Sequence, residues 1–152
     1  MTQNRKAFLD MIAFSEIGPA LLAKSDNGYN VIVGGGLFSG YADHPRKVVK
    51  IPKLNLCSSA AGRYQLLARY WDAYKKQLKL KDFSPASQDA VALQQIKECG
   101  ALPDIDAGNF DAAVKKCSRI WASLPGAGYG QNENPLDKLR FAYVNAGGKL
   151  SA

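Results

Sequence analysis

Glu16 is the residue whose position in the sequence best suits a general acid. Apolar residues recur at helical spacing over positions 4–15, and Glu16 extends their stripe at the C-terminal end of the predicted helix. Burial and the negative end of the helix dipole both disfavour a charged carboxylate there. A carboxyl that is neutral near pH 7 can donate a proton in catalysis. The alternative interpretation is a helix-end glutamate that bends out to solvent.

Two neighbouring residues, Tyr64 and Gln65, carry groups that suit sugar recognition. A tyrosine presents an aromatic face, and a glutamine amide can donate to and accept from hydroxyl and acetamido groups. Segment 60–65 is predicted to open a helix, in which case Tyr64 could instead pack and Gln65 could simply favour the helix. The glycine-rich loop over 124–131 carries Tyr129, and such loops often serve binding.

Motifs for other kinds of chemistry are incomplete. The glycines at 34, 35, 36 and 40 fit neither the dinucleotide pattern nor the phosphate-loop pattern, and no nucleophile elbow occurs. Asp43 precedes His44, but no serine or cysteine nucleophile motif accompanies the pair, so His44 is interpreted as a loop residue. One histidine and three cysteines offer no credible zinc quartet. We therefore expect no metal and no cofactor.

Most of the chain that must position these residues is predicted to be helical. Gly18–Pro19 ends the first helix, and the β-branched segments Tyr29–Val33 and Val48–Ile51 predict a small hairpin or a three-stranded sheet. Four further helices are expected. Their predicted starts are Ser59 or a neighbour, Ser84–Pro85, Asn109 and Asn134–Pro135.

Length and composition suit one domain over residues 1–152 with its own core, because 47% of the residues are hydrophobic. No apolar run approaches the roughly 20 residues of a membrane span, and the first residues lack the apolar segment of a secretory signal. The 20 Lys and Arg against 13 Asp and Glu give a net charge of +7. This charge favours an anionic partner such as nucleic acid, a membrane surface or a charged polymer.

The three cysteines, Cys57, Cys99 and Cys117, fit free thiols better than a disulfide framework in a chain without a secretory signal. The helix that follows Asn109 is predicted to carry Cys117 and Ile120 on its inward stripe. Cys117 is therefore expected to pack as a small hydrophobic residue.

Long stretches of the chain resemble a known family. They include QNRKAFLDMIAFSE, GYNVIVGG, DHPRK, AGRYQLL and IWASLPGAGYGQ, in the same order from Gln3 to Gln131. On these stretches the chain resembles the lambda-type phage endolysins, the lambda lysozyme family of lytic transglycosylases. The resemblance implies an α+β lysozyme-like fold that is mainly helical, with a small antiparallel sheet near the N-terminal third and two lobes around a sugar-binding cleft. It also implies two mobile lips over the cleft, at about 47–56 and 124–137.

The same resemblance makes Glu16 the catalytic acid. Candidate sugar contacts are polar or amphipathic residues of the matched segments, namely Asn30, Tyr64, Gln65 and Tyr129. Two positions depart from the lambda-type pattern, because Asn30 replaces an aspartate and Gly36 replaces a glutamate. Most glycosidases need two carboxylates, and the loop residues Asp26 and Asp43 remain as candidates without a motif. A mechanism with one carboxylate is therefore the more economical hypothesis.

The function that the resemblance implies is that of a peptidoglycan lytic transglycosylase for host cell lysis. Such an enzyme cleaves the β-1,4 bond between N-acetylmuramic acid and N-acetylglucosamine and forms a 1,6-anhydromuramyl product. Two alternatives stay open: a hydrolytic muramidase on the same fold, and a non-catalytic module that binds cell wall or nucleic acid.

The partners expected on this basis are peptidoglycan glycan strands and a holin, which is needed for release without necessarily touching the enzyme. We expect a monomer that neither binds nucleic acid nor inserts stably into a membrane. The chain would remain in the host cytoplasm until holin-mediated release and would then act in the periplasm at the cell wall.

Overall fold

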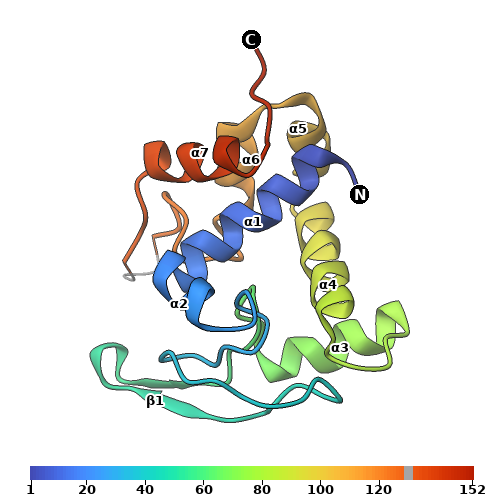
Figure 1. The fold of residues 1–152 in the computed structure, drawn as a ribbon, viewed down its shortest axis with the longest axis vertical. Coiled ribbons are helices and arrows are strands. Elements are labelled where there is room, and N and C mark those ends of the chain that lie inside the picture. Colours follow the sequence, from blue (N-terminus) through green and yellow to red (C-terminus); the bar gives the residue numbers. More distant parts are fainter. Residues whose placement is uncertain (129–131) are drawn as a thin grey trace. The chain divides into compact units, whose positions relative to one another are not determined.

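The computed structural model describes residues 1–128 and 132–152, and Figure 1 shows its ribbon. The chain divides into two compact units, one formed by Met1–Glu16 with Ala92–Ala152 and the other by Ile17–Val91. Across the described ranges, helices predominate and the only sheet has two antiparallel strands. The predicted class, mainly helical α+β with a small sheet in the first part of the chain, is confirmed. One domain over 1–152 and two lobes around a cleft stay predictions.

The unit that contains both chain ends is helical. Its elements are α1 (Gln3–Ile17, of which Ile17 belongs to the other unit), the second half of α4 (Pro85–Glu98), α5 (Leu102–Ala107), α6 (Phe110–Cys117) and α7 (Leu136–Asn145). Three buried rings join α1, α6 and α7. The centroid of Phe8 lies 6.0 Å from that of Phe110 and 6.5 Å from that of Tyr143, and the last two are 4.7 Å apart. This aromatic packing fixes α1, whose last turn carries Glu16.

The unit formed by Ile17–Val91 holds the sheet. Its elements are α2 (Pro19–Lys24), β1 (Val49–Ile51), the 3-10 helix η1 (Pro52–Leu54), β2 (Leu56–Ser58), α3 (Ala68–Leu78) and the first half of α4. The hairpin pairs Lys50 with Cys57. The core of this unit centres on the fully buried Trp71 and Phe83, whose rings meet edge to face at 5.0 Å. Val49 of β1 packs against this core and so attaches the hairpin to it.

Several predicted element boundaries are confirmed. Residues 84 and 85 open α4, where the Ser84 hydroxyl accepts a hydrogen bond from the Ser87 N–H at 3.4 Å. The Asn134–Pro135 pair directly precedes α7, and β1 falls within the predicted Val48–Ile51. Cys117 is fully buried as expected, and all three cysteines are free thiols.

The prediction of a strand over Tyr29–Val33 is wrong. This segment makes only isolated bridges, such as the one between Val31 and Leu37. Gly34 and Gly35 have φ angles of +89° and +95°, and they turn the chain back directly after the segment. Such angles suit glycine and interrupt an extended strand, so a longer ladder cannot form.

The predicted start of the helix near Ser59 is also wrong, because α3 begins at Ala68. Ser59 still caps α3 from outside the helix, since its hydroxyl accepts a hydrogen bond from the Ala68 N–H at 3.0 Å. Between them, Gly62 and Gln65 have positive φ angles of 85° and 53°. These angles form a turn that a helix cannot include.

Two further differences concern short helices. Ile120 was predicted to face inward, but α6 ends at Cys117 and Ile120 is 40% exposed. The helices α2 and α5 were not predicted. Each has six residues with a proline in its first turn, which is too short for a helical period to be recognised.

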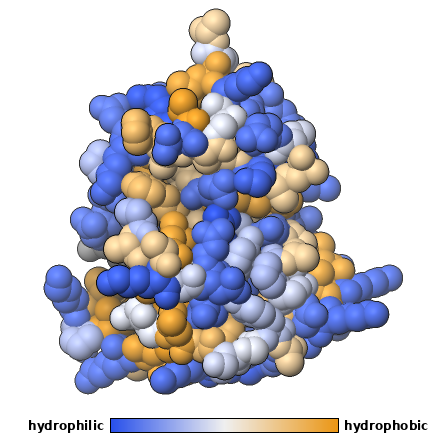
Figure 2. Space-filling model, in the orientation of Figure 1, coloured by the Kyte–Doolittle hydropathy of each residue, from blue (hydrophilic) through white to orange (hydrophobic). Residues whose placement is uncertain are grey.

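The surface mixes residue types. On the face drawn in Figure 2, hydrophilic and hydrophobic residues are interspersed. Within residues 1–128 and 132–152, no helix combines the length and the apolar character that crossing a membrane requires.

The turn before α3 yields a stability test. Gly62 and Gly40 have similar φ angles, +85° and +82°, but a Cβ on Gly62 would collide with the Gln88 side chain, whereas one on Gly40 would meet nothing within 4 Å. We expect Gly40→Ala to lower the free energy of unfolding by about 1 kcal/mol through backbone strain alone. We expect Gly62→Ala to lower it by about 3 kcal/mol, since overpacking adds to the strain. Urea titration of both variants measures the difference, and equal losses would contradict the close packing of Gln88.

Candidate active site

Glu16 ends a chain of hydrogen bonds in the unit that contains both chain ends. The Ser123 hydroxyl donates a short hydrogen bond to Oε2 of Glu16. The hydroxyls of Ser15 and Ser123 are 2.7 Å apart, and Nδ2 of Asn134 lies 3.0 Å from Oγ of Ser15. Because an amide nitrogen can only donate and Ser123 gives its proton to Glu16, Ser15 must donate to Ser123. The protons of this hydrogen-bond chain therefore all point toward the carboxyl of Glu16.

The electrostatic surroundings of Glu16 keep a large fraction of its carboxyl protonated near pH 7. Burial raises the pKa of Glu16 from 4.5 to about 7, and the hydrogen bond from Ser123 opposes this increase. The last turn of α1 contains no basic residue, and among the described residues Glu16 forms no ion pair. Desolvation therefore dominates, as predicted for a carboxyl at the end of an inward stripe.

Asp43 and His44 have structural partners in the other unit. Asp43 pairs with Arg46 at 2.8 Å and accepts a hydrogen bond from the Trp71 indole at 2.9 Å. Arg46 lowers the pKa of Asp43. His44 is only 2% exposed and lies 2.8 Å from the Leu66 carbonyl through Nε2, while its Nδ1 accepts the Arg46 N–H at 2.9 Å. These two bonds suit the neutral form of the His44 ring, in which Nε2 donates and Nδ1 accepts, and burial lowers the pKa of His44.

Asp26 and Asn30 stabilise a loop. Asp26 accepts a hydrogen bond from the Tyr41 hydroxyl at 2.5 Å, and its own N–H donates to Oδ1 of Asn30 at 2.8 Å. Burial raises the pKa of Tyr41, and the bond to Asp26 adds to this increase. Within the described ranges, no group of three or more His, Cys, Asp or Glu residues could hold a metal ion.

Tyr64 and Gln65 lie in the turn before α3 rather than in a helix. Tyr64 is 5% exposed, and its hydroxyl donates to Asp89 at 2.6 Å and accepts from the buried Arg63 at 2.9 Å. Gln65 has a left-handed backbone and directs Nε2 to the Gly62 carbonyl at 2.8 Å. Its Oε1 makes no hydrogen bond within the part of the chain that the structure describes. Tyr129 lies outside the described residues.

The candidate residues therefore fall into two groups. Glu16 belongs to one unit, and Asn30, Tyr64 and Gln65 belong to the other. Gln65 approaches the segment that carries Asn30. Its Nε2 lies 3.4 Å from the carbonyl of Val31, the residue directly after Asn30.

Sequence reasoning missed the residues that surround the acid. Ser123 was not singled out, and Asn134 was interpreted only as the start of a helix. Both flank the glycine-rich segment between α6 and α7. Small polar residues beside such a loop could have indicated hydrogen-bond partners for a buried carboxyl. Asn134 also donates to the carbonyl of Ser15 at 3.1 Å, which fastens this segment to the end of α1.

Comparison with known proteins gives one consistent result. The model of the Endolysin family matches residues 6–150. The endolysin of Escherichia phage lambda is 62% identical over 152 residues, covering 99% of this chain and 95% of that protein. The endolysin of Escherichia phage P2 is 48% identical over 155 residues, covering 96% and 94%.

Solved structures agree with these relatives. A bacteriophage lambda lysozyme complexed with a chitohexasaccharide has a TM-score of 0.94 and 60% identity, covering 99% of this chain and 97% of that one. Another lysozyme from bacteriophage lambda has a TM-score of 0.87 and 57% identity, with the same coverage. The chain belongs to the endolysin family and has the architecture of a lysozyme-like enzyme that degrades the cell wall.

The hydrogen bond from Ser123 provides a test of the electrostatics. Ser123→Ala removes the one contact that lowers the pKa of Glu16, so we expect that pKa to rise further, by roughly one unit. Carboxyl carbon chemical shifts followed against pH measure the change. Ser118→Ala, which removes a hydroxyl bonded instead to the Lys115 carbonyl, serves as the control. An unchanged or lower pKa in Ser123→Ala would exclude the contact as a determinant.

The raised pKa of Glu16 also predicts how stability depends on pH. Between pH 4.5 and 7 the folded chain binds more protons at this site than the unfolded chain, so the stabilising contribution is complete below pH 4.5 and is lost as the pH rises through 7. We therefore expect Glu16→Gln to gain stability relative to the wild type across this window, reaching about 3 kcal/mol at pH 8. Urea titrations of both proteins at several pH values measure the difference, and a pH-independent difference would contradict the assignment.

Proposed function

We propose that the chain is a peptidoglycan lytic transglycosylase in which Glu16 is the single catalytic carboxyl. The substrate is the β-1,4 bond between N-acetylmuramic acid and N-acetylglucosamine. Family membership and the likeness to a lambda lysozyme complexed with a chitohexasaccharide support a glycan as the ligand. The observation that carries the proposal is a carboxyl with a pKa of about 7 at the end of a directed hydrogen-bond chain.

In the first step, neutral Glu16 donates its proton to the oxygen that bridges the two sugars, and the bond from that oxygen to C1 breaks. Oε1 is the donor, because Oε2 already accepts the proton of Ser123. When the pKa lies near the working pH, a large fraction of the group is protonated and its proton is still readily transferred. Both properties are needed in a general acid.

In the second step, the Glu16 carboxylate removes the proton from the C6 hydroxyl of the muramic acid. The C6 oxygen then attacks C1 and closes the 1,6-anhydro ring, so no water is consumed. An internal nucleophile has a high effective concentration, and participation of the neighbouring acetamido group could stabilise the intermediate. The chain from Asn134 through Ser15 to Ser123 stabilises the carboxylate that exists between the two steps.

The surroundings of the other acidic candidates support a mechanism with one carboxylate. Asp43 is engaged by Arg46 and Trp71, and Asp26 is engaged by Tyr41. A catalytic nucleophile or base needs a carboxylate free to meet the substrate. Both aspartates instead stabilise loops in the Ile17–Val91 unit.

The sugar contacts that we propose differ in kind. Gln65 would bind through Oε1, because its Nε2 already donates to the Gly62 carbonyl. Asn30 would bind through its side-chain amide nitrogen, because its Oδ1 already accepts the Asp26 N–H. Tyr129 stays a candidate from its sequence position. Tyr64 is bonded to Asp89 and almost fully buried, so it would act by holding the turn that carries Gln65.

We further propose that both units form one catalytic domain over residues 1–152 that works as a monomer. Release from the host cytoplasm by a holin would bring it to the periplasm and the peptidoglycan. No nucleic acid, cofactor or stable membrane insertion is part of this proposal.

The catalytic role of Glu16 can be tested by substitution. Glu16→Gln retains the shape but has no acidic proton, so we expect lysis of peptidoglycan-exposing cells to fall by about 10²–10⁴-fold with the fold intact. Asp10→Asn is the matched control, because Asp10 lies on the same helix in a surface pair with Lys6. Turbidity loss and circular dichroism measure activity and folding. Substantial lysis by folded Glu16→Gln would assign the acid elsewhere.

The products distinguish the transglycosylase from a muramidase. Mass spectrometry of muropeptides from digested peptidoglycan should detect 1,6-anhydromuramyl ends, each one water lighter than a reducing end. Reducing ends alone would make the enzyme a hydrolytic muramidase and would overturn the mechanism with one carboxylate.

The pH dependence follows from the protonation state that the first step requires. The acid form of Glu16 is lost as the pH rises through about 7, so we expect kcat/KM to decrease above that pH. Initial rates on soluble peptidoglycan fragments between pH 5 and 9 measure the midpoint. A rate that is flat across this range would contradict Glu16 as the acid.

A further inference from the structure

Two neighbouring residues of α4, Gln88 and Asp89, contact both segments that carry the amide candidates for sugar binding. These segments are the loop with Asn30 and the turn with Gln65. Every residue involved belongs to the unit formed by Ile17–Val91. The proposed mechanism uses neither of the two α4 residues.

The side-chain amide of Gln88 bonds to the backbone of both segments. Its Oε1 accepts the Arg63 N–H at 2.9 Å, and its Nε2 donates to the carbonyl of Tyr29 at 3.1 Å and to that of Phe83 at 2.9 Å. An amide supplies the one acceptor and the two donors that these backbone groups require. Gln88 is only 4% exposed, so water has little access to replace the three bonds. The two bonded segment positions, 29 and 63, each stand within two residues of a candidate amide.

Asp89 joins the same segments through tyrosine hydroxyls. Its Oδ1 accepts from Tyr29 at 2.9 Å and from Tyr64 at 2.6 Å. Burial raises the pKa of both tyrosines, so their hydroxyls retain the protons that they donate. Arg63 ties the segments to each other, because its Nε donates to the Asn27 carbonyl at 3.0 Å and its Cζ lies 5.3 Å from the centre of the Tyr29 ring. Such a connected network restricts the backbone of both segments.

We propose that Gln88 and Asp89 are positioning residues that hold Asn30 and Gln65 in the arrangement that binds a glycan strand. This inference rests on the proposed function, because it assigns a role to the residues behind the sugar contacts proposed there. In this role neither α4 residue touches the sugar. Amides that are already fixed in the binding geometry lose less conformational entropy when the glycan binds. Loss of the network therefore weakens glycan binding.

Binding of a chitohexasaccharide to full-length Glu16→Gln protein tests this role without turnover, and calorimetry measures the dissociation constant Kd. In this background we expect Gln88→Met to raise Kd by roughly 5–10-fold, since a methionine of similar shape makes none of the three bonds. Ser87→Ala is the matched control. Ser87 is also buried on α4, but its hydroxyl is bonded to Ser84 and Asp82. Its loss should leave Kd unchanged even where it lowers stability.

The outcomes separate this inference from the proposed function. A background protein that does not bind the hexasaccharide would overturn both. Binding that a folded Gln88→Met protein retains at full strength would overturn the positioning role alone. Tyr29→Phe is a milder second variant, because it removes one hydroxyl bond to Asp89 and keeps the ring. It should raise Kd about 3-fold, and an unchanged Kd would exclude Asp89 from the role.

A double substitution distinguishes positioning from a merely structural effect. Gln65→Ala removes one of the amides that Gln88 is inferred to position. Because part of the effect of Gln88 then passes through Gln65, the double variant should raise Kd by less than the product of the two single effects. Effects that multiply fully would show that the two residues act independently, which is incompatible with the proposal.

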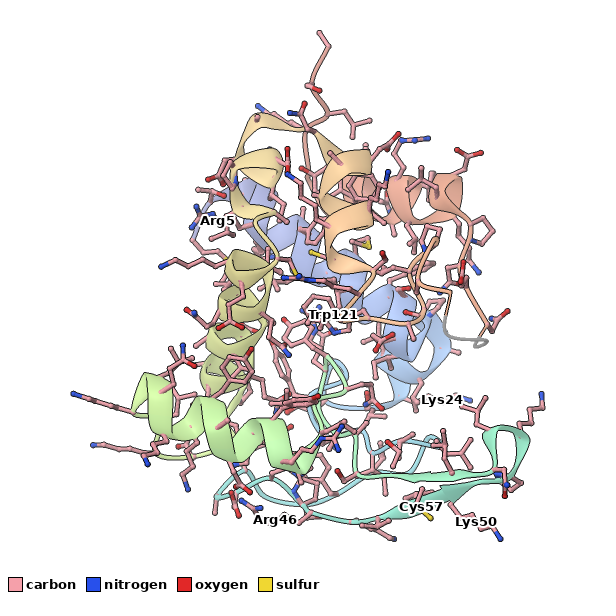
Figure 3. The ribbon with its side chains drawn as sticks, turned by 180° about the vertical axis from the view of Figure 1, so that it is seen from behind. Arg5, Lys24, Arg46, Lys50, Cys57 and Trp121 are labelled. Carbon is pink, nitrogen blue, oxygen red and sulfur yellow. The ribbon has the colours of Figure 1, made fainter. Side chains whose placement is uncertain are left out.

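Nuclear magnetic resonance of the unbound protein gives a readout that needs no glycan. We expect Gln88→Met to shift the side-chain amide signals of Asn30 and Gln65. The backbone signals of Lys50 and Cys57 serve as the reference, because Figure 3 shows both residues on the hairpin, away from α4. Amide signals that move no more than this reference would mean that Gln88 does not position them.

Discussion

A desolvated carboxyl that has no counter-charge among the described residues is the constraint on which the candidate site depends. Raising the pKa of Glu16 from 4.5 to about 7 corresponds to at most about 3 kcal/mol of differential solvation. One hydrogen bond from Ser123 offsets part of this cost without reversing it. A lysine or arginine in contact with Glu16 would make it an ordinary carboxylate. The ring contacts of Phe8 with Phe110 and Tyr143 fix α1, the helix whose last turn carries Glu16.

Under the proposed mechanism, the division of the candidate residues between two units gives each unit a separate task. One unit tunes the acid through residues on α1 and in the segment between α6 and α7. The other carries the amides of Asn30 and Gln65, in loops stabilised by internal contacts of Asp26 and Gly62. The division into units falls after Glu16 in α1 and after Val91 in α4.

The sequence allowed accurate prediction where local rules dominate. Periodicity identified α1, and the Ser84–Pro85 and Asn134–Pro135 pairs identified the starts of α4 and α7. The mistaken strand and the mistaken start of α3 have another origin. There, glycines with positive φ and long-range bonds, such as that from the Arg63 N–H to Gln88, decide the backbone path against the local propensity.

The environment of the site was the least predictable part. Ser123 is 107 positions from Glu16, and no spacing rule connects a hydroxyl at that separation with a carboxyl. The burial of Tyr64 was equally hidden, because it depends on Asp89 of α4. Glu16 could be singled out as the candidate acid from one helix, whereas its hydrogen-bond partners could only be seen once distant segments were folded together.

The sequence separation within this hydrogen-bond chain has a consequence for biosynthesis. A ribosome makes Glu16 early, but it makes Ser123 and Asn134 only when most of the chain has been translated. Until those residues emerge, the nascent chain lacks the hydroxyl donor that binds this carboxyl. An unfinished or truncated translation product that ends before Ser123 is therefore unable to assemble this hydrogen-bond chain, and under the proposed mechanism activity would be restricted to chains that are almost complete.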